Sequence, residues 1–389
     1  LGANTTADNN TAIGHEALKT NQTGTGNTAV GRDALETNTA NDNTAVGYEA
    51  LKLNAAGTRN SAVGRNALEA NTSGDNNTAM GTNALLLNTT ASGNTAFGAD
   101  SLSANTIGCR NVAVGHEAMN SNTEGNCNTA VGRKALVINT TGDKNTAFGH
   151  TALGGLTTGS ENTGVGFDVM NSTVTGTGNT AVGHGNMSSL TSGATNTSIG
   201  NSATPALTTG SNNTTAGDAS GISLTTGVNN LLLGHDAGRS GSPGGTINTG
   251  SNFIVLGDEN ISNAAIQVDW TVASDQRDKT DFNNLDLGLD FVNKLNPVTY
   301  KWDKRSKYDK DLSVTPNGEH KENWLDLGFK AQEVEALEIE AGYNKDNKTN
   351  LTINLSSDGK QYGVQYAKFV PILVNAIKEL KAEIELLKN

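Results

Sequence analysis

Two patterns of apolar and polar residues divide the chain. Through about residue 260, a short run, Asn-Thr-Ala-aliphatic-Gly, returns every 17 residues, with a single step of 16 between Asn27 and Asn43. An Ala-Leu pair and a second Asn complete the unit, which reads N-T-A-V-G-x-x-A-L-x-x-N-T-x-G-x-x. The first Asn of the unit recurs at Asn10, Asn27, Asn43, Asn60, Asn77, Asn94, Asn111, Asn128, Asn145, Asn162, Asn179, Asn196, Asn213 and Asn230, and a degenerate copy begins at Asn252. Such a short fixed period predicts one supersecondary unit stacked on itself.

Seventeen residues are too few for a helical hairpin, whereas Thr-Ala-Val runs favour strands and Gly and Asn favour turns. We therefore predict that each unit is one coil of a β-solenoid or β-roll with two short strands. Adjacent Ala and Val point to opposite faces of a strand, so Ala is expected in a narrow interior and Val30, Met80, Phe97 and Phe148 on a face that meets another chain. The Asn columns are expected to form hydrogen-bond ladders. Because so thin a coil buries little surface, we expect a homo-oligomer.

The last part of the chain follows other periods. An amphipathic stretch from Leu285 to Leu295 stops at Asn296-Pro297 and precedes a strand-like segment, residues 298–302. A long helix ends the chain. Its apolar positions alternate in steps of three and four, at Val370, Leu373, Ile377, Leu380, Ile384 and Leu387. This heptad seam predicts a coiled coil over residues 366–389.

Composition places the boundary between the two parts at Ser274. Residues 1–273 hold 10 Lys and Arg against 19 Asp and Glu, and residues 274–389 hold 17 against 20, out of 27 and 39 in the whole chain. Of the 46 Gly, all but six precede Ser274. We thus predict a mainly β shaft of residues 1–260, a junction of residues 261–273, and a small α+β domain of residues 274–389 that ends in the coiled-coil helix.

Several classes of function are disfavoured by the same counts. The net charge of −12 argues against a nucleic-acid partner, which needs a basic patch. No run of about 18 apolar residues exists, so no membrane insertion is expected. Cys109 and Cys127 do not make a disulfide framework, although one disulfide between them stays open. No metal and no cofactor are expected.

The repeats themselves offer little chemistry. One residue after the strand Gly stands a His in five units, at His15, His116, His150, His184 and His235. These could line up as a metal ladder, but a solvated turn histidine is favoured because most of them are several coils apart. A Thr column could be an ice-binding face, or simply a strand preference.

The N-T-A-V-G-x-x-A-L unit resembles the head repeats of trimeric autotransporter adhesins and the shafts of phage tail fibres. That resemblance implies a trimeric left-handed β-roll, although the unit length differs. Leu1 and Asn4 already occupy columns of an earlier unit, so we expect the chain to begin in mid-repeat. A preceding part would then contact other tail proteins.

Four motifs of the last 116 residues occur in an order that resembles the C-terminal intramolecular chaperone autoprotease of phage tail spikes and tail fibres. They are S-D-x-R-x-K at Ser274–Lys279, L-N-P-V-x-Y-x-W at Leu295–Trp302, G-F-x-A-Q-E at Gly328–Glu333 and Y-G-V-x-Y at Tyr362–Tyr366. The resemblance implies a Ser-Lys dyad, with Ser274 as nucleophile and Lys279 as general base. It also implies cleavage of the bond between Ala273 and Ser274.

The dyad poses a geometric requirement. Five residues of separation put Ser274 and Lys279 on opposite faces of a strand, so the segment must turn or a neighbouring subunit must supply part of the site. A lysine base also needs desolvation or nearby cations that lower its pKa. Arg277 is a candidate for that role or for holding a carboxylate, and Asp275 for orienting a partner; an exposed charged turn is the alternative for both.

The expected function is a trimeric viral tail-fibre or tail-spike protein, located in the virion tail, that binds a host cell-surface receptor, expected to be a glycan. Its C-terminal domain would drive trimerisation and folding and then cleave itself off. Three alternatives remain open: a bacterial surface adhesin with a β-roll head, an ice-binding or purely structural solenoid, and a polysaccharide depolymerase. The last needs paired carboxylates, which no repeat carries.

Overall fold

The computed structural model describes residues 2–267, 270–309, 311–346 and 348–388. The chain forms two compact units. The first runs to Ala237 and includes Asn248–Leu256, and the second combines Gly238–Ile247 with the chain from Gly257 onward. A loop of residues 238–247 therefore leaves the repeats and joins the second unit.

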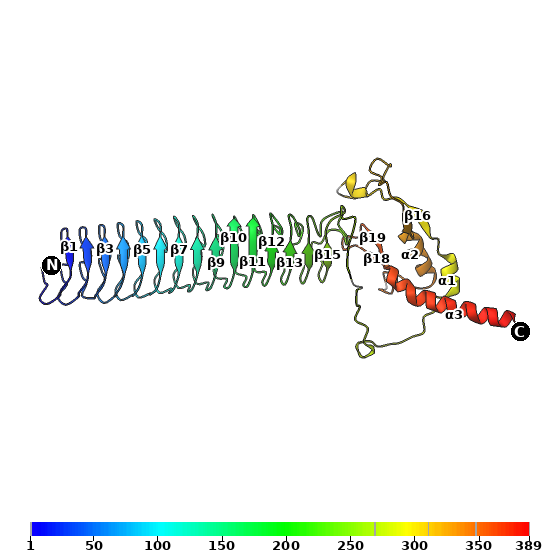
Figure 1. Cartoon of the computed structure of the whole chain (residues 1–389), viewed down its shortest axis with the longest axis horizontal. Helices are drawn as coiled ribbons and strands as arrows, with labels where there is room; N and C mark the ends of the chain where they lie inside the picture. Colours follow the sequence, from blue (N-terminus) through cyan, green and yellow to red (C-terminus); the bar gives the residue numbers. More distant parts are fainter. Residues whose placement is uncertain (1, 268–269, 310, 347, 389) are drawn as a thin grey trace. The chain divides into compact units, whose positions relative to one another are not determined.

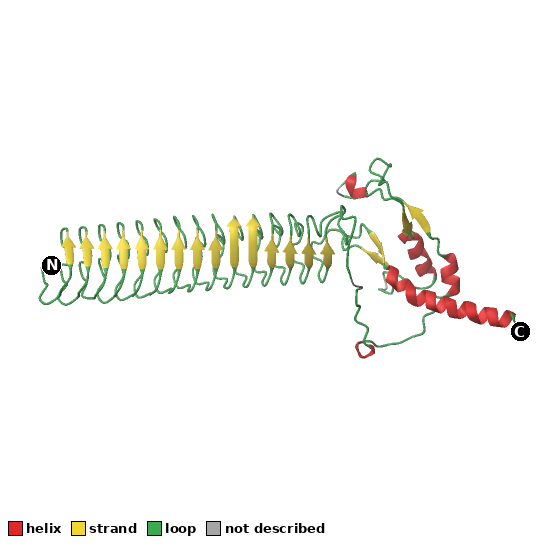
Figure 2. Ribbon diagram, viewed as in Figure 1, coloured by secondary structure: helices red, strands yellow, loops and turns green. Residues whose placement is uncertain are grey.

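The first unit is a parallel β-solenoid with one strand per coil (Figures 1 and 2). Its sheet holds 15 strands in sequence order, and neighbouring strands pair in the repeat register, so that Thr11 lies beside Thr28 and Ala12 beside Ala29. The strands are β1 (Thr11–Ile13), β2 (Thr28–Val30), β3 (Thr44–Val46), β4 (Ser61–Val63), β5 (Thr78–Met80), β6 (Thr95–Phe97), β7 (Val112–Val114), β8 (Thr129–Val131), β9 (Thr146–Phe148), β10 (Thr163–Phe167), β11 (Thr180–His184), β12 (Thr197–Ile199), β13 (Thr214–Ala216), β14 (Leu231–Leu233) and β15 (Ile254–Leu256). The predicted solenoid is confirmed.

The prediction of two strands per coil is wrong. The Ala-Leu pair lies in a turn whose leucine adopts left-handed backbone angles, for example Leu35 at φ 51° and Leu68 at φ 54°. Two residues earlier, Asp33 and Asn66 adopt the same conformation, at φ 60° and 56°. This alternation curls the chain tightly, which a second extended strand would not do.

The interior of the solenoid holds the strand alanine, as the sequence predicts. The central strand alanine and the Ala-Leu pair are fully buried, as in Ala79, Ala84 and Leu85. The strand residue that follows the alanine points outward, and its exposed fraction is 46% for Phe97, 58% for Phe148 and 60% for Ile13. The expected placement of the strand alanine inside and of the next residue on an apolar outer face is confirmed, and the interior also holds the leucine of the Ala-Leu pair.

The strand glycine is required by its surroundings. Gly81 has φ +143°, and a Cβ atom there would lie 2.4 Å from the carbonyl oxygen of Gly98 in the next coil. Both the backbone angle and the close approach of the coils therefore exclude larger residues.

Two ladders of buried asparagines run along the solenoid, as predicted. In the first, the Asn77 amide donates to Oδ1 of Asn60 at 2.9 Å, and its side chain donates to the Ala91 carbonyl at 2.8 Å. In the second, Asn71 Nδ2 donates to Oδ1 of Asn54 at 2.7 Å. These side chains satisfy the polar backbone groups that a thin interior would otherwise leave unpaired.

The residues with candidate chemistry in the repeats lie on the surface. Cys109 and Cys127 are free thiols, so the open possibility of a disulfide is not realised. The rings of His150 and His184 stack on either face of Phe167, with centroids 5.2 and 5.4 Å apart, rather than converging on a common point.

The second unit is a small α+β domain. Its helices are α1 (Leu289–Lys294), α2 (Ala331–Glu340) and α3 (Phe369–Leu387), with short 3-10 turns η1 (Gln276–Asp278), η2 (Arg305–Lys307) and η3 (Tyr366–Lys368). Two antiparallel strand pairs complete it: β16 (Val298–Tyr300) with β17 (Asp326–Gly328), and β18 (Ile353–Leu355) with β19 (Tyr362–Val364). Its core contains Leu287, Phe291, Val334, Ile353, Phe369 and Ile372.

Two features of this domain refine the sequence-based view. The amphipathic stretch of residues 285–295 is helical only over Leu289–Lys294, because Gly288 has a non-helical backbone (φ −145°, ψ −135°) and Leu287 enters the core outside any helix or strand. The final helix α3 buries Phe369, Ile372 and Ala376, whereas the heptad seam lies on the exposed side, with Ile377 65% exposed. Among the described helices, none combines the length and apolarity needed to cross a membrane.

Candidate functional site

The segment around Ser274 folds into a tight turn rather than a strand. Asp275 caps η1: its carboxylate accepts a hydrogen bond from the Arg277 amide at 2.9 Å. The Lys279 amide closes the turn by donating to the Gln276 carbonyl at 3.2 Å. A Ser-Asp sequence is well suited to such a start because the short acidic side chain reaches the free amides of the first turn.

This turn brings the two residues of the predicted dyad together within one chain. The Nζ of Lys279 lies 2.5 Å from Oγ of Ser274 and 3.3 Å from the Ser274 carbonyl oxygen. The five-residue spacing that would separate them in a strand is thus bridged by η1. Nζ and Oγ are therefore within hydrogen-bond distance, the separation over which a proton can pass between a hydroxyl and a general base.

Arg277 pairs with Asp275 rather than with the dyad. Its Nη2 lies 2.6 Å from Oδ2 of Asp275, and its Nε lies 3.1 Å from Oδ1. These hydrogen bonds lower the pKa of Asp275 and raise that of Arg277. Both side chains are exposed, so the pair fixes the shape of the turn more than it stabilises the fold.

The chain is exposed on both sides of the predicted dyad. Trp270 is 74% exposed and Val272 is 80% exposed, and Phe282 follows Lys279 with its ring largely in solvent. The single chain therefore presents the dyad in an open, accessible form.

Helix α3 holds the irregular segment that links the predicted dyad to the domain core. Asn375 Nδ2 donates to the carbonyl oxygens of Leu285 and Leu287 at 3.2 and 3.1 Å. Glu379 accepts a hydrogen bond from the Leu289 amide at 2.6 Å, at the start of α1. The single sequence gives no pattern that would single out either residue.

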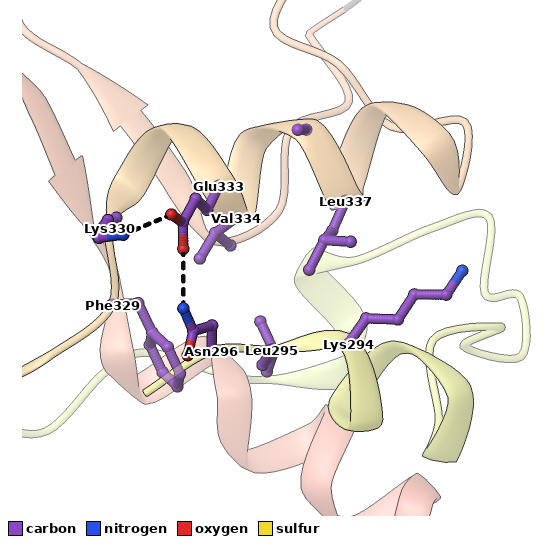
Figure 3. A pocket seen from close by; sticks show the side chains of 9 residues that line it. Lys294, Leu295, Asn296, Phe329, Lys330, Glu333, Val334 and Leu337 are labelled. Atoms are coloured by element: carbon purple, nitrogen blue, oxygen red, sulfur yellow. Dashed lines mark hydrogen bonds and ion pairs between the residues drawn. The ribbon is translucent and has the colours of Figure 1, made fainter. Parts of the chain in front are cut away.

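The separated family-like motifs assemble into the body of the domain. Leu295 and Asn296 face Phe329, Lys330 and Glu333 across an open groove between the end of α1 and α2 (Figure 3). Glu333 bridges the two sides, accepting from Lys330 at 2.7 Å and from Asn296 at 3.4 Å (Figure 3). No dyad residue lines the groove, so these motifs support the fold and not the reacting atoms.

A buried carboxylate joins α2 to the strand pair β18–β19. Glu338 is fully buried, and its Oε1 accepts from the Thr352 amide and hydroxyl, each at 2.6 Å. Its Oε2 accepts from the Leu351 amide at 3.2 Å. Charge-assisted bonds of this kind compensate for the loss of solvent around the carboxylate.

Comparison with known families gives one match, which lies within the second unit. Residues 274–343 match the Peptidase_S74 family model, described as the chaperone of endosialidase. The match begins at Ser274, the residue at which composition also divides the chain. Neither the curated proteins nor the solved structures contain a match. The chain thus combines a β-solenoid with a C-terminal region that matches a peptidase-type intramolecular-chaperone family.

Proposed function

We propose that the chain is the precursor of a trimeric tail fibre or tail spike, and that its C-terminal domain cuts the bond between Ala273 and Ser274. The observation that carries this proposal is the 2.5 Å contact between Lys279 Nζ and Ser274 Oγ, at the first residue of the matched family region. Ser274 acts as nucleophile and Lys279 as general base. Arg277 and Asp275 hold the turn that joins them.

The reaction proceeds in two steps. Ser274 Oγ, losing its proton to Lys279, attacks the carbonyl carbon of Ala273, and the C–N bond breaks as the Ser274 nitrogen takes that proton. This acyl shift leaves an ester between Ala273 and Ser274 Oγ. Water then hydrolyses the ester, returning a proton to Oγ and leaving a carboxylate on Ala273. One cut yields a product of 273 residues and one of 116, the remainder of the 389.

A homotrimer is supported by two exposed apolar surfaces. One is the outer strand column of the solenoid, which includes Ile13, Phe97 and Phe148. The other is the seam of α3 through Leu373, Ile377 and Leu380. Both run along regular elements at fixed spacing, as surfaces that pair with copies of themselves do.

The repeat explains the need for a helper domain. Near-identical coils give chains little to fix their mutual alignment, and slipped pairings bury similar surface. Assembly of long-range β structure from three chains is also slow and prone to aggregation. A trimerising C-terminal domain aligns the chains, and cleavage after folding removes the route back, so the fibre is kinetically trapped.

In this proposal the mature shaft belongs to the virion tail, contacts other tail proteins, and attaches to a host receptor of glycan type. A surface adhesin or an ice-binding solenoid would share the shaft. Neither, however, calls for a self-cleaving C-terminal domain, which is why the tail protein is preferred.

The test is the fate of the purified full chain on a denaturing gel. Wild type is expected to give the 273- and 116-residue products, whereas Ser274→Ala and Lys279→Ala stay whole. Ser262→Ala and Lys301→Ala, at exposed positions away from the dyad, serve as matched controls and are expected to be cut. An intact wild type, or cleavage of the Ser274→Ala chain at the same bond, would overturn the assignment.

A further inference from the structure

The loop of residues 238–247, which leaves the repeats, is internally ordered. The Ile247 amide donates to the Gly238 carbonyl at 2.9 Å, so the two ends of the loop meet. Inside it, Ser242 Oγ accepts from the Gly238 amide at 3.0 Å and donates to the Arg239 carbonyl at 2.8 Å. Ser242 and Ile247 are fully buried. A loop closed in this way keeps one shape and can serve as a recognition surface.

The loop contacts the turn between β18 and β19. Asp358 Oδ2 accepts from the Thr246 amide at 2.9 Å, and Ser357 Oγ donates to the Thr246 carbonyl at 2.8 Å. The Ser357 amide donates to the Gly244 carbonyl at 3.1 Å. Asp358 and Ser357 of the turn thus form hydrogen bonds with the backbone amide and carbonyl of Thr246 and with the carbonyl of Gly244.

Both sides of this contact are shaped for it. Gly245 has φ +72°, and a Cβ atom there would lie 2.5 Å from Oδ1 of Asp358. Asp358 is itself held by Ser356 Oγ at 2.6 Å and the Lys360 amide at 3.1 Å. Burial raises the pKa of Asp358, but the hydrogen bonds from Ser356, Thr246 and Lys360 outweigh it and lower the pKa, so the carboxylate is charged at neutral pH.

A second contact lies beside the first. Lys304 Nζ donates to the Glu259 carbonyl at 2.6 Å, and Lys307 bonds the side chain of Asn260. Glu259 and Asn260 precede Ala273, as the loop does, whereas Lys304, Lys307 and the turn follow Ser274. The bonds of Thr246 and Gly244 with the turn, and those of Lys304 and Lys307, therefore join residues on opposite sides of the proposed cut.

We propose that the loop of residues 238–247 and the turn of residues 356–358 form a clasp that keeps the two cleavage products together. Breaking the Ala273–Ser274 bond removes the covalent link and leaves the clasp intact, so the C-terminal product stays bound to the shaft until the clasp opens. The consequence for release rests on the proposed cleavage, whereas the contact itself does not.

The first experiment follows the products of the cleaved full chain by size-exclusion chromatography at neutral pH. The wild-type products are expected to co-elute. Asp358→Ala, which removes the acceptor of the Thr246 amide, is expected to release the C-terminal product at least tenfold faster. Gly245→Ala is expected to disrupt the same contact from the loop side, because its Cβ would collide with Asp358. Asp346→Ala, which removes an exposed carboxylate of the same domain, is the control. Wild-type products that separate as soon as they form would overturn the proposal.

The second experiment makes the contact testable even if cleavage fails. In the Ser274→Ala chain, hydrogen exchange is measured at the Thr246 amide with and without Asp358→Ala. An increase of at least tenfold at Thr246, with unchanged exchange in α2 and α3, is expected. Unchanged exchange at Thr246, or an equal rise throughout the domain, would contradict the clasp. A wild-type chain that stays whole would contradict the proposed cleavage but not the contact between the loop and the turn.

Discussion

Replacing Asn71 by alanine tests whether the buried asparagine ladder holds the solenoid together. Asn71 is fully buried, and its side chain takes part in three hydrogen bonds. Its Nδ2 donates to Asn54 Oδ1 at 2.7 Å and to the Gly74 carbonyl at 3.0 Å, and its Oδ1 accepts from Asn88 at 2.9 Å. The ladder thus passes through this side chain to the coil on either side.

The expected cost follows from these bonds. Each is worth about 1 kcal/mol net, and Oδ1 of Asn54 would face the vacated space at a further cost of about 1 kcal/mol. The local free energy of unfolding should therefore fall by about 4 kcal/mol, similar to a large-to-small change in a well-packed core. Asn71→Asp keeps the shape but removes both donors and buries a charge, so it should cost at least as much.

Hydrogen exchange resolved along the chain is the suitable assay, because a long repeat does not unfold as one two-state unit. A loss of about 4 kcal/mol corresponds to roughly a thousandfold faster exchange in the coils flanking Asn71. Ser73→Ala, at an exposed position of the same coil, is the control and should change little. If Asn71→Ala exchanges within tenfold of that control, the ladder is not what stabilises the coils.

Two further changes test the C-terminal domain. Ile377→Asp, in the exposed seam of α3, is expected to lower the oligomeric state in analytical ultracentrifugation without loss of helix by circular dichroism. Ala382→Asp, off the seam, is the control and should leave the assembly intact. A fully assembled Ile377→Asp chain would exclude the seam as an interface. Glu338→Ala leaves three donors of Leu351 and Thr352 without their carboxylate acceptor, so the free energy of unfolding of this domain, followed by thermal melting, is expected to fall by about 3 kcal/mol. Glu383→Ala, at an exposed position, should change it little. Equal melting temperatures of the two variants would contradict the role of the buried carboxylate.

The sequence was sufficient for features that repeat and insufficient for features that occur once. Fourteen asparagines recur at nearly constant spacing, and most of them are followed by an alanine and a glycine at fixed positions. These repeated residues predict the coil, its interior and its ladders. The second strand was predicted wrongly because a buried Ala-Leu pair reads the same in a strand and in a turn. What separates them is the left-handed backbone of Leu35 and Asp33, which apolar periodicity does not record.

For the predicted dyad, the sequence identified the two residues but not the turn that brings them together. Motif order suggested Ser274 and Lys279, yet strand geometry alone would have kept them apart. The deciding residue is Asp275, whose cap on η1 turns the chain and brings Nζ to Oγ. Contacts between distant segments, such as Asp358 with Thr246 and Asn375 with Leu285, carry no signal in one sequence, because each partner is an ordinary polar residue in its own surroundings.

The interior of the solenoid also shows where the repeat stops being interchangeable. In most coils the inward columns hold alanine and leucine, so looping out one coil would leave equivalent neighbours in contact. Asn186, Ser198, Thr204 and Thr215 replace those residues in successive coils, and all are buried. Ser198 Oγ donates to Asn186 Oδ1 at 2.7 Å and accepts from Thr204 and Thr215 at 2.7 and 2.8 Å. A shift of one coil would bury these groups against apolar neighbours and leave them unpaired. The coils that precede the 238–247 loop therefore have one favoured pairing register. Because each coil pairs with the next, this register also determines the pairing of the coils nearer the N-terminus.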